Sequence, residues 1–148
     1  DAARTHAVGE VSEEAKKLIQ VTKECFFEGI KYAKAGNHLF DISGAIGRYA
    51  EERGYGVVRD LCGHGIGTAL HEAPEIPNYE VGRKGVKLRP GMTLAIEPMI
   101  NIGTYEVDWL DDDWTVVTRD GSLSAHYENT ILITEGEPRI LSLTCDNE

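Results

Sequence analysis

The hydrophobic periodicity of the sequence changes once, near Gly56, and this change constrains the fold more than any other feature. Before Gly56, apolar and small residues recur at steps of three and four, which is the spacing of one helix face. After it, short runs of β-branched residues alternate with Gly, Pro and Asp, which is typical of strands joined by turns. Helices first and strands afterwards predict an α+β fold, with helices covering one face of a mainly antiparallel sheet.

Two helices are predicted before the change. The first begins after Ser12, a suitable N-cap, and continues until Gly36. The second carries an apolar stripe that begins at Ile42, and it ends at Gly54. Five strands are predicted over residues 57–59, 92–102, 114–118, 123–134 and 140–143.

Composition limits the possible classes of protein. A chain of 148 residues with 41% hydrophobic residues can form one core, so residues 1–148 are expected to form a single domain. The formal net charge of −10 disfavours phosphate backbones and anionic membranes as partners. No apolar run approaches the roughly 20 residues that span a bilayer, and the start lacks a signal-peptide layout. A cytoplasmic location with neither nucleic-acid nor membrane partners is therefore expected.

Several common sites are not supported by the residue spacing. Cys25, Cys62 and Cys145 are odd in number and lack CxxC spacing, which predicts reduced thiols rather than disulfides or a thiolate metal site. The run from Asp111 to Asp113 lacks the donor pattern of a calcium loop and is expected at a solvated hairpin tip. The glycines show no GxGxxG after a strand, so no nucleotide site is predicted.

Two histidines stand in a glycine-rich segment. His64 lies between glycines, where the backbone can approach a ligand closely, and His71 follows seven residues later. A lone histidine is most often structural, but the pair makes an inert loop a weaker interpretation. The segment is not a zincin helix, because Glu75 stands where the second zincin histidine would be.

Two glutamates are embedded in predicted strands. Glu97 lies in an apolar strand on a face otherwise lined by small residues, and Glu128 shares a face with His126 and Thr130. A carboxylate in an apolar strand is costly unless it is paired or bound to metal, so an ion pair with Lys or Arg is the alternative. Together with His64, these carboxylates form a donor set that suits Mn²⁺, Fe²⁺, Co²⁺ or Zn²⁺.

Three motifs together resemble the type I methionine aminopeptidases. They are Gly-His-Gly-Ile-Gly over residues 63–67 followed by His71-Glu-x-Pro, Gly-Met-Thr-x-x-Ile-Glu-Pro-Met over residues 91–99, and Ser-Ala-His-Tyr-Glu-Asn-Thr-Ile over residues 124–131. The resemblance extends from Asp1 to about Leu143, and the seven-residue step between the histidines is similar to type I rather than type II enzymes.

The resemblance implies the C-terminal part of a pita-bread fold, in which two helices cover a curved sheet and two metal ions share bridging carboxylates. Asp1 and Glu128 match the bridging carboxylates of the family, and His64 and Glu97 match the remaining ligands of one ion. The implied activity is metal-assisted removal of N-terminal methionine from nascent or short peptides, in which the ions lower the pKa of a water molecule.

Further roles follow from the same resemblance. Glu97 would transfer a proton, and His71 would hydrogen-bond the substrate amide or the developing oxyanion. Leu70 stands where the family often has Phe at the methionine pocket, and Trp114 matches an aromatic residue near that pocket. His126 is close enough in sequence to Glu128 to reach the site, and a position next to the metal ligands or at the surface is expected for it.

The sequence departs from the family at its start. The first metal-binding Asp of the family and the N-terminal half of its fold have no counterpart before Asp1, so a truncated catalytic domain is expected. Such a chain would bind one ion better than two, have little peptidase activity and associate through the exposed edge. A proline-specific aminopeptidase and a non-catalytic protein-binding module of the same fold are the alternatives.

Overall fold

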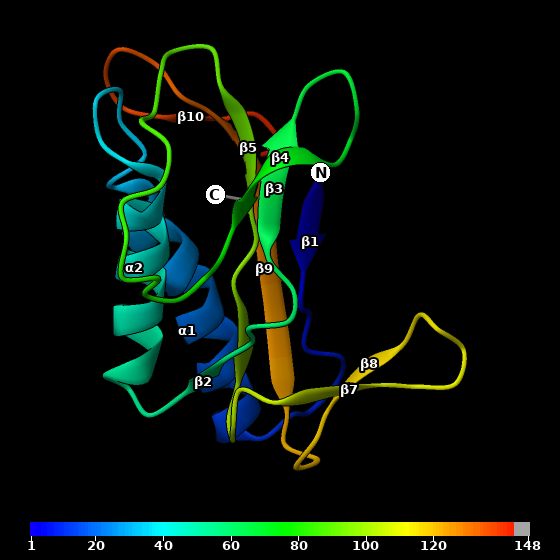
Figure 1. Ribbon diagram of the computed structural model, residues 1–148. Coiled ribbons are helices and arrows are strands. Elements are labelled where there is room, and N and C mark those ends of the chain that lie inside the picture. The colour runs from blue at the N-terminus through cyan, green and yellow to red at the C-terminus, as the bar shows by residue number, and fades with distance from the viewer. Residues whose placement is uncertain (144–148) are drawn as a thin grey trace.

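The computed structural model describes residues 1–143, which form two helices on one side of a mainly antiparallel sheet (Figure 1). The helices are α1 (Glu13–Ile30) and α2 (Leu39–Glu51). The strands are β1 (Ala2–Arg4), β2 (Gly56–Val57), β3 (Gly63–Ile66), β4 (Glu72–Ile76), β5 (Thr93–Ile96), β6 (Met99–Asn101), β7 (Val107–Trp109), β8 (Val116–Thr118), β9 (Ser124–Leu132) and β10 (Arg139–Ile140). The predicted α+β segregation is confirmed.

Local hydrogen bonds explain where the helices begin. Ser12 caps α1 as predicted, because its hydroxyl accepts the Ala15 N–H at 3.1 Å. Helix α1 ends at Ile30, six residues before Gly36. Helix α2 begins three residues before Ile42, because the Asp41 carboxylate accepts the His38 N–H at 2.8 Å and stabilises an earlier first turn.

Strand β9 organises the main sheet, whose order is β2-β6-β9-β5-β3-β4. Along one edge β9 pairs with β5 and β6, and along the other it pairs with β1 and β10, all antiparallel. Strands β7 and β8 form a separate hairpin that extends away from the sheet (Figure 1). The central position of β9 allows residues from both ends of the chain to meet beside it.

Four strands are absent from the sequence prediction, namely β1, β3, β4 and β7. Strands β3 and β4 are rich in Gly, Pro and Glu and lack the β-branched alternation on which the prediction relied. The single strand predicted over 92–102 is wrong, because Pro98 interrupts it and separates β5 from β6. The break places Glu97 in the gap between two strands.

The hydrophobic core fills the space between the helices and one face of the sheet. Leu94 and Ile96 of β5 and Tyr127 and Ile131 of β9 belong to it, and Phe26 of α1 packs on Tyr127 with ring centroids 5.4 Å apart. Alternate residues on these strands face the opposite side, where the metal-binding candidates lie.

The remaining sequence predictions concern the surface and the thiols. Cys25 is a buried free thiol and Cys62 a half-buried one, as expected, whereas Cys145 lies outside the described residues. The run from Asp111 to Asp113 forms the predicted hairpin tip between β7 and β8. Within residues 1–143, neither helix has the length and apolar character needed to cross a bilayer.

Candidate metal centre

Side chains from four separate segments converge beside β9. Asp1 precedes β1, His64 lies on β3, Glu97 follows β5 and Glu128 lies on β9. His64 Nε2 is 3.6 Å from Asp1 Oδ2 and 3.5 Å from Glu97 Oε1. Ligand atoms of His64, Glu97 and Glu128 all lie within 4.8 Å of one another, which is close enough to surround one cation.

Strand register explains this convergence. His64 stands opposite Ala95 of β5, and Ala95 stands opposite Thr130 of β9. On the other edge of β9, Ala3 stands opposite Glu128, which brings Asp1 to the same level. Residues remote in sequence therefore share one face at one height along the sheet.

The glycines around His64 allow β3 to lie close to both of its neighbours. A Cβ at Gly63 would lie 2.3 Å from the Ala95 carbonyl oxygen, and a Cβ at Gly65 would lie 2.3 Å from the Ala73 carbonyl oxygen. Both distances are far below van der Waals contact. Only glycine on each side of His64 therefore permits this packing of β3 between β4 and β5.

The strand break at Glu97 is held by hydrogen bonds. The Asn78 side-chain amide donates to the Glu97 carbonyl at 3.1 Å, and the Tyr127 N–H donates to the Pro98 carbonyl at 3.2 Å. Asn78 is fully buried, so the break is part of the packed interior. The backbone of Glu97 is therefore held in place beside His64 and Glu128.

Glu128 is buried and Glu97 is largely buried, and neither has a conventional cationic partner in the described part of the chain. Among residues 1–143, the ion-pair contacts of Glu97 and Glu128 involve histidines, and no Lys or Arg pairs with either carboxylate. Arg4 donates to the Glu128 backbone carbonyl instead. The alternative of a Lys or Arg ion pair is therefore wrong, and Oε1 of each glutamate remains buried without a hydrogen-bond partner.

The electrostatics of the centre favour a bound cation. Burial, together with the nearby charge of Glu128, raises the pKa of Glu97 to about 8. Burial also raises the pKa of Glu128, although the N-terminal ammonium, His71 and Arg4 oppose this. A positive charge placed between two such carboxylates would stabilise their ionised forms.

His71 lies at the open side of this cluster. It is exposed, and its ring centroid is 4.2 Å from that of His64. Ligand atoms of Asp1, His64 and His71 also lie within 4.8 Å of one another. His71 is therefore accessible to a substrate and close to the group of donors.

His126 was expected either beside the site or at the surface, and the structure places its ring beside the cluster. Its Nε2 is 3.7 Å from Glu97 Oε2 and 3.8 Å from Glu128 Oε2, and it is buried without a hydrogen-bond partner. The two-residue step from His126 to Glu128 on one strand is the signal that placed both residues on the same face.

The two predicted methionine-pocket residues lie outside the cluster. Leu70 is in the loop between β3 and β4, next to His71, and is 55% exposed. Trp114 is 84% exposed on the β7–β8 hairpin, which extends away from the sheet (Figure 1). Their roles in substrate binding remain predictions.

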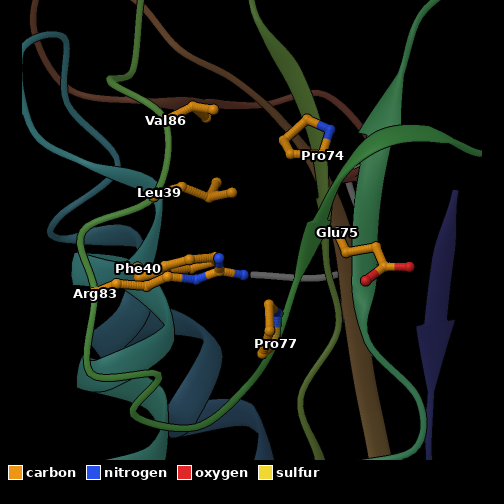
Figure 2. Close-up of a pocket in the computed structure, with 8 residues that line it drawn as sticks. Leu39, Phe40, Pro74, Glu75, Pro77, Arg83 and Val86 are labelled. Atoms are coloured by element: carbon orange, nitrogen blue, oxygen red, sulfur yellow. The ribbon is translucent and has the colours of Figure 1, made fainter.

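A separate cavity of about 360 Å³ lies between the start of α2, β4 and residues 83–86 (Figure 2). Its walls include Leu39 and Phe40 from α2 and the two prolines of the β4 region, Pro74 and Pro77. In Figure 2 the Glu75 carboxylate points away from these walls. The lining contains none of the four metal-ligand candidates, so this cavity is not part of the centre.

Comparison with known proteins gives concordant matches. The pattern of metallopeptidase family M24 matches residues 1–135. A methionine aminopeptidase of Clostridium acetobutylicum is 61% identical over 143 residues, covering 97% of this chain and 57% of that protein. The chain thus spans somewhat more than half the length of that relative.

Solved structures give the same result. The crystal structure of a methionine aminopeptidase from Thermotoga maritima matches with a TM-score of 0.93 and 50% identity, over 97% of this chain and 57% of that chain. A prolidase from Pyrococcus furiosus matches with a TM-score of 0.73 and 26% identity, over 97% of this chain and 36% of that chain. The predicted C-terminal part of a pita-bread fold is thereby confirmed.

Proposed function

The chain belongs to metallopeptidase family M24, and we propose that it supplies the metal centre of an aminopeptidase that removes N-terminal methionine by hydrolysing the first peptide bond. The observation that carries this proposal is the buried group of His64, Glu97 and Glu128, whose ligand atoms lie within 4.8 Å of one another. Identity of 61% to a methionine aminopeptidase supports the choice of substrate.

The donor set fits a divalent metal ion. The Oε1 atoms of Glu97 and Glu128 are buried without partners, and a cation would satisfy both. Carboxylate oxygens with one imidazole suit Mn²⁺, Fe²⁺, Co²⁺ or Zn²⁺, and Asp1 is the additional carboxylate ligand of the proposal. When bound, such an ion acts as a Lewis acid and lowers the pKa of a water molecule.

The other functional side chains of the site act on protons and on the substrate. Glu97 lies within the donor cluster and is proposed to accept and return a proton during hydrolysis. His71 is exposed beside His64 and can donate a hydrogen bond to the substrate carbonyl or amide. Leu70, adjacent to His71, is proposed to contact the methionine side chain, together with Trp114.

The number of ions is part of the proposal. Among the described residues, one ion would have four candidate ligands, namely Asp1, His64, Glu97 and Glu128. We therefore expect these residues to hold one ion tightly. Calorimetric titration with Mn²⁺ and Co²⁺ tests this expectation, and the absence of any tight site would contradict it.

Hydrolysis assays test the choice of substrate. The metal-loaded chain, and a version extended to the length of its relatives, are assayed with Met-Ala-Ser and with a panel of Xaa-Pro dipeptides. Preferential release of methionine supports the proposal, whereas preference for Xaa-Pro supports the proline-specific alternative, which the more distant prolidase similarity leaves open. Absence of any hydrolysis by the extended protein, with metal bound, would favour a non-catalytic binding module.

A further inference from the structure

His126 occupies a position that the proposed metal-binding residues leave unexplained. Its Nε2 lies between two carboxylates, at 3.7 Å from Glu97 Oε2 and 3.8 Å from Glu128 Oε2. It is buried and has no hydrogen-bond partner. A buried ring nitrogen that faces two acidic oxygens calls for a physical account, because such groups are nearly always satisfied.

We propose that His126 is a positioning residue of the metal centre, whose Nε2–H holds the outer oxygens of Glu97 and Glu128 so that their inner oxygens face the cation. This inference rests on the proposed function. It assigns a direct structural task to a side chain that is neither a metal ligand nor a substrate contact in that proposal.

The two oxygens of Glu97 face different imidazoles. Oε1 is 3.5 Å from His64 Nε2, whereas Oε2 is 3.7 Å from His126 Nε2. The carboxylate thus lies between one histidine that belongs to the ligand group and one that does not. Such a division leaves one oxygen for the ion and one for an outer hydrogen bond, the usual arrangement around a metal-binding carboxylate.

Electrostatics select the tautomer of His126. Ionised carboxylates only accept hydrogen bonds, so a lone pair on Nε2 would be repelled by both glutamates, whereas an N–H would be attracted. The two distances exceed a good hydrogen bond by only about half an ångström, which a small carboxylate rotation removes. The ring can therefore donate to either outer oxygen.

The backbone of His126 is fixed on both edges of β9. The Thr5 hydroxyl donates to the His126 carbonyl at 3.0 Å and accepts the His126 N–H at 2.8 Å. On the opposite edge Met99 of β6 is the pairing partner of His126. The ring is therefore carried by a rigid element, as accurate positioning of a ligand requires.

Two nearby hydrogen-bond donors, Asn78 and Arg4, do not donate to the carboxylate groups of Glu97 and Glu128. The Asn78 amide donates to the Glu97 backbone carbonyl, and Arg4 donates to the Glu128 backbone carbonyl and to Asn129. Both donors therefore fix the main chain of a ligand residue and leave the orientation of its side chain free. His126 supplies the hydrogen bond that orients the two carboxylate groups.

Three variants test the inference by Co²⁺ titration of the full chain, followed by calorimetry and by the visible d–d spectrum. His126→Leu removes the N–H, His126→Gln keeps an N–H donor of similar reach, and His6→Gln makes the same chemical change at an exposed residue outside the cluster. We expect His126→Leu to weaken Co²⁺ binding about 10- to 100-fold, the range for loss of an outer hydrogen bond. His126→Gln should restore affinity to within about threefold of the original chain, and His6→Gln should leave it unchanged.

The outcomes separate this inference from the proposed function. If the original chain binds Co²⁺ and His126→Leu binds it equally well, the inference alone is overturned. If His126→Gln is as weak as His126→Leu, N–H donation is overturned. A changed d–d band position in both variants would overturn positioning in favour of direct ligation. If the original chain does not bind Co²⁺, the metal centre itself fails and this inference fails with it. Metal-free melting curves check that all variants are folded.

Discussion

The two faces of β9 show how one strand serves both stability and chemistry. On the face toward the helices, Ala125, Tyr127 and Ile131 are buried in the hydrophobic core. On the opposite face Glu128 is buried and His126 is partly buried, yet each retains a buried polar atom without a partner. The two faces therefore differ less in the burial of their side chains than in whether their buried polar atoms have hydrogen-bond partners.

This contrast indicates which face stabilises the fold without metal. Apolar side chains removed from water favour folding by roughly 25 cal/mol per Å² of buried area. Buried polar atoms without partners oppose it, and the raised pKa of Glu97 and of Glu128 expresses the same cost. The helix-covered face should therefore stabilise the protein at all times, and the opposite face should stabilise it only when a cation is bound.

The largest effect is expected on the helix-covered face. Phe26→Ala removes a fully buried ring that packs on Tyr127 and should lower the free energy of unfolding by about 3–5 kcal/mol. Urea denaturation of the metal-free protein measures this, and the Co²⁺ affinity of the folded fraction should stay unchanged. A loss below about 1 kcal/mol, or a comparable loss of Co²⁺ affinity, would mean that the two faces are not separable in this way.

The converse effect is expected on the metal-binding face. Glu128→Gln keeps the shape but removes a carboxylate ligand, so metal affinity should fall at least about 100-fold, beyond the range for an outer contact. Metal-free stability should stay equal or rise, because a buried charge is removed and the pKa of Glu97 moves back toward its ordinary value. Calorimetry and melting curves measure the two effects. A metal-free protein that is clearly less stable would contradict the contrast.

Much of this contrast was predictable from the sequence. The steps of three and four before Gly56 predicted both helices, because helix α1 buries a stripe on a core-facing side. Glu97 and Glu128 were singled out because a carboxylate in an apolar run needs a compensating group. Their meeting point was not predictable from periodicity, since it depends on the pairing of β9 with strands from both ends of the chain.

The failures of prediction have equally definite causes. Strand β3 consists of Gly, His, Gly and Ile, a composition typical of loops, and it becomes a strand only because its glycines fit between β4 and β5. His126 was expected beside the site or at the surface, and only the fold, which brings Glu97 Oε2 to 3.7 Å from its Nε2, decides between these positions. Tertiary contacts, rather than local preference, decided both outcomes.

A smaller effect is expected from pH, and it also distinguishes the faces. Below about pH 8 the Glu97 carboxyl binds a proton that a metal ion must displace, so Mn²⁺ affinity should rise about tenfold per pH unit from pH 6 to pH 8. Because its folded pKa lies above the unfolded value, metal-free stability should fall as pH rises through the same window. Titrations and melting curves at pH 6, 7 and 8 measure these trends. Affinity that is independent of pH would contradict the assignment of Glu97 as a ligand.

The smallest effect tests the helix layer far along the chain from the ligands. Ser12→Ala removes the side-chain oxygen that accepts the Ala15 N–H at the start of α1, and should lower the free energy of unfolding by about 1 kcal/mol. Ser12→Asp, which keeps an acceptor, is the matched control and should retain stability. Both variants should bind Co²⁺ like the original chain, because the metal-binding face receives no ligand from α1. A shift in Co²⁺ affinity beyond about threefold would show that the helix layer and the opposite face are energetically coupled through the sheet.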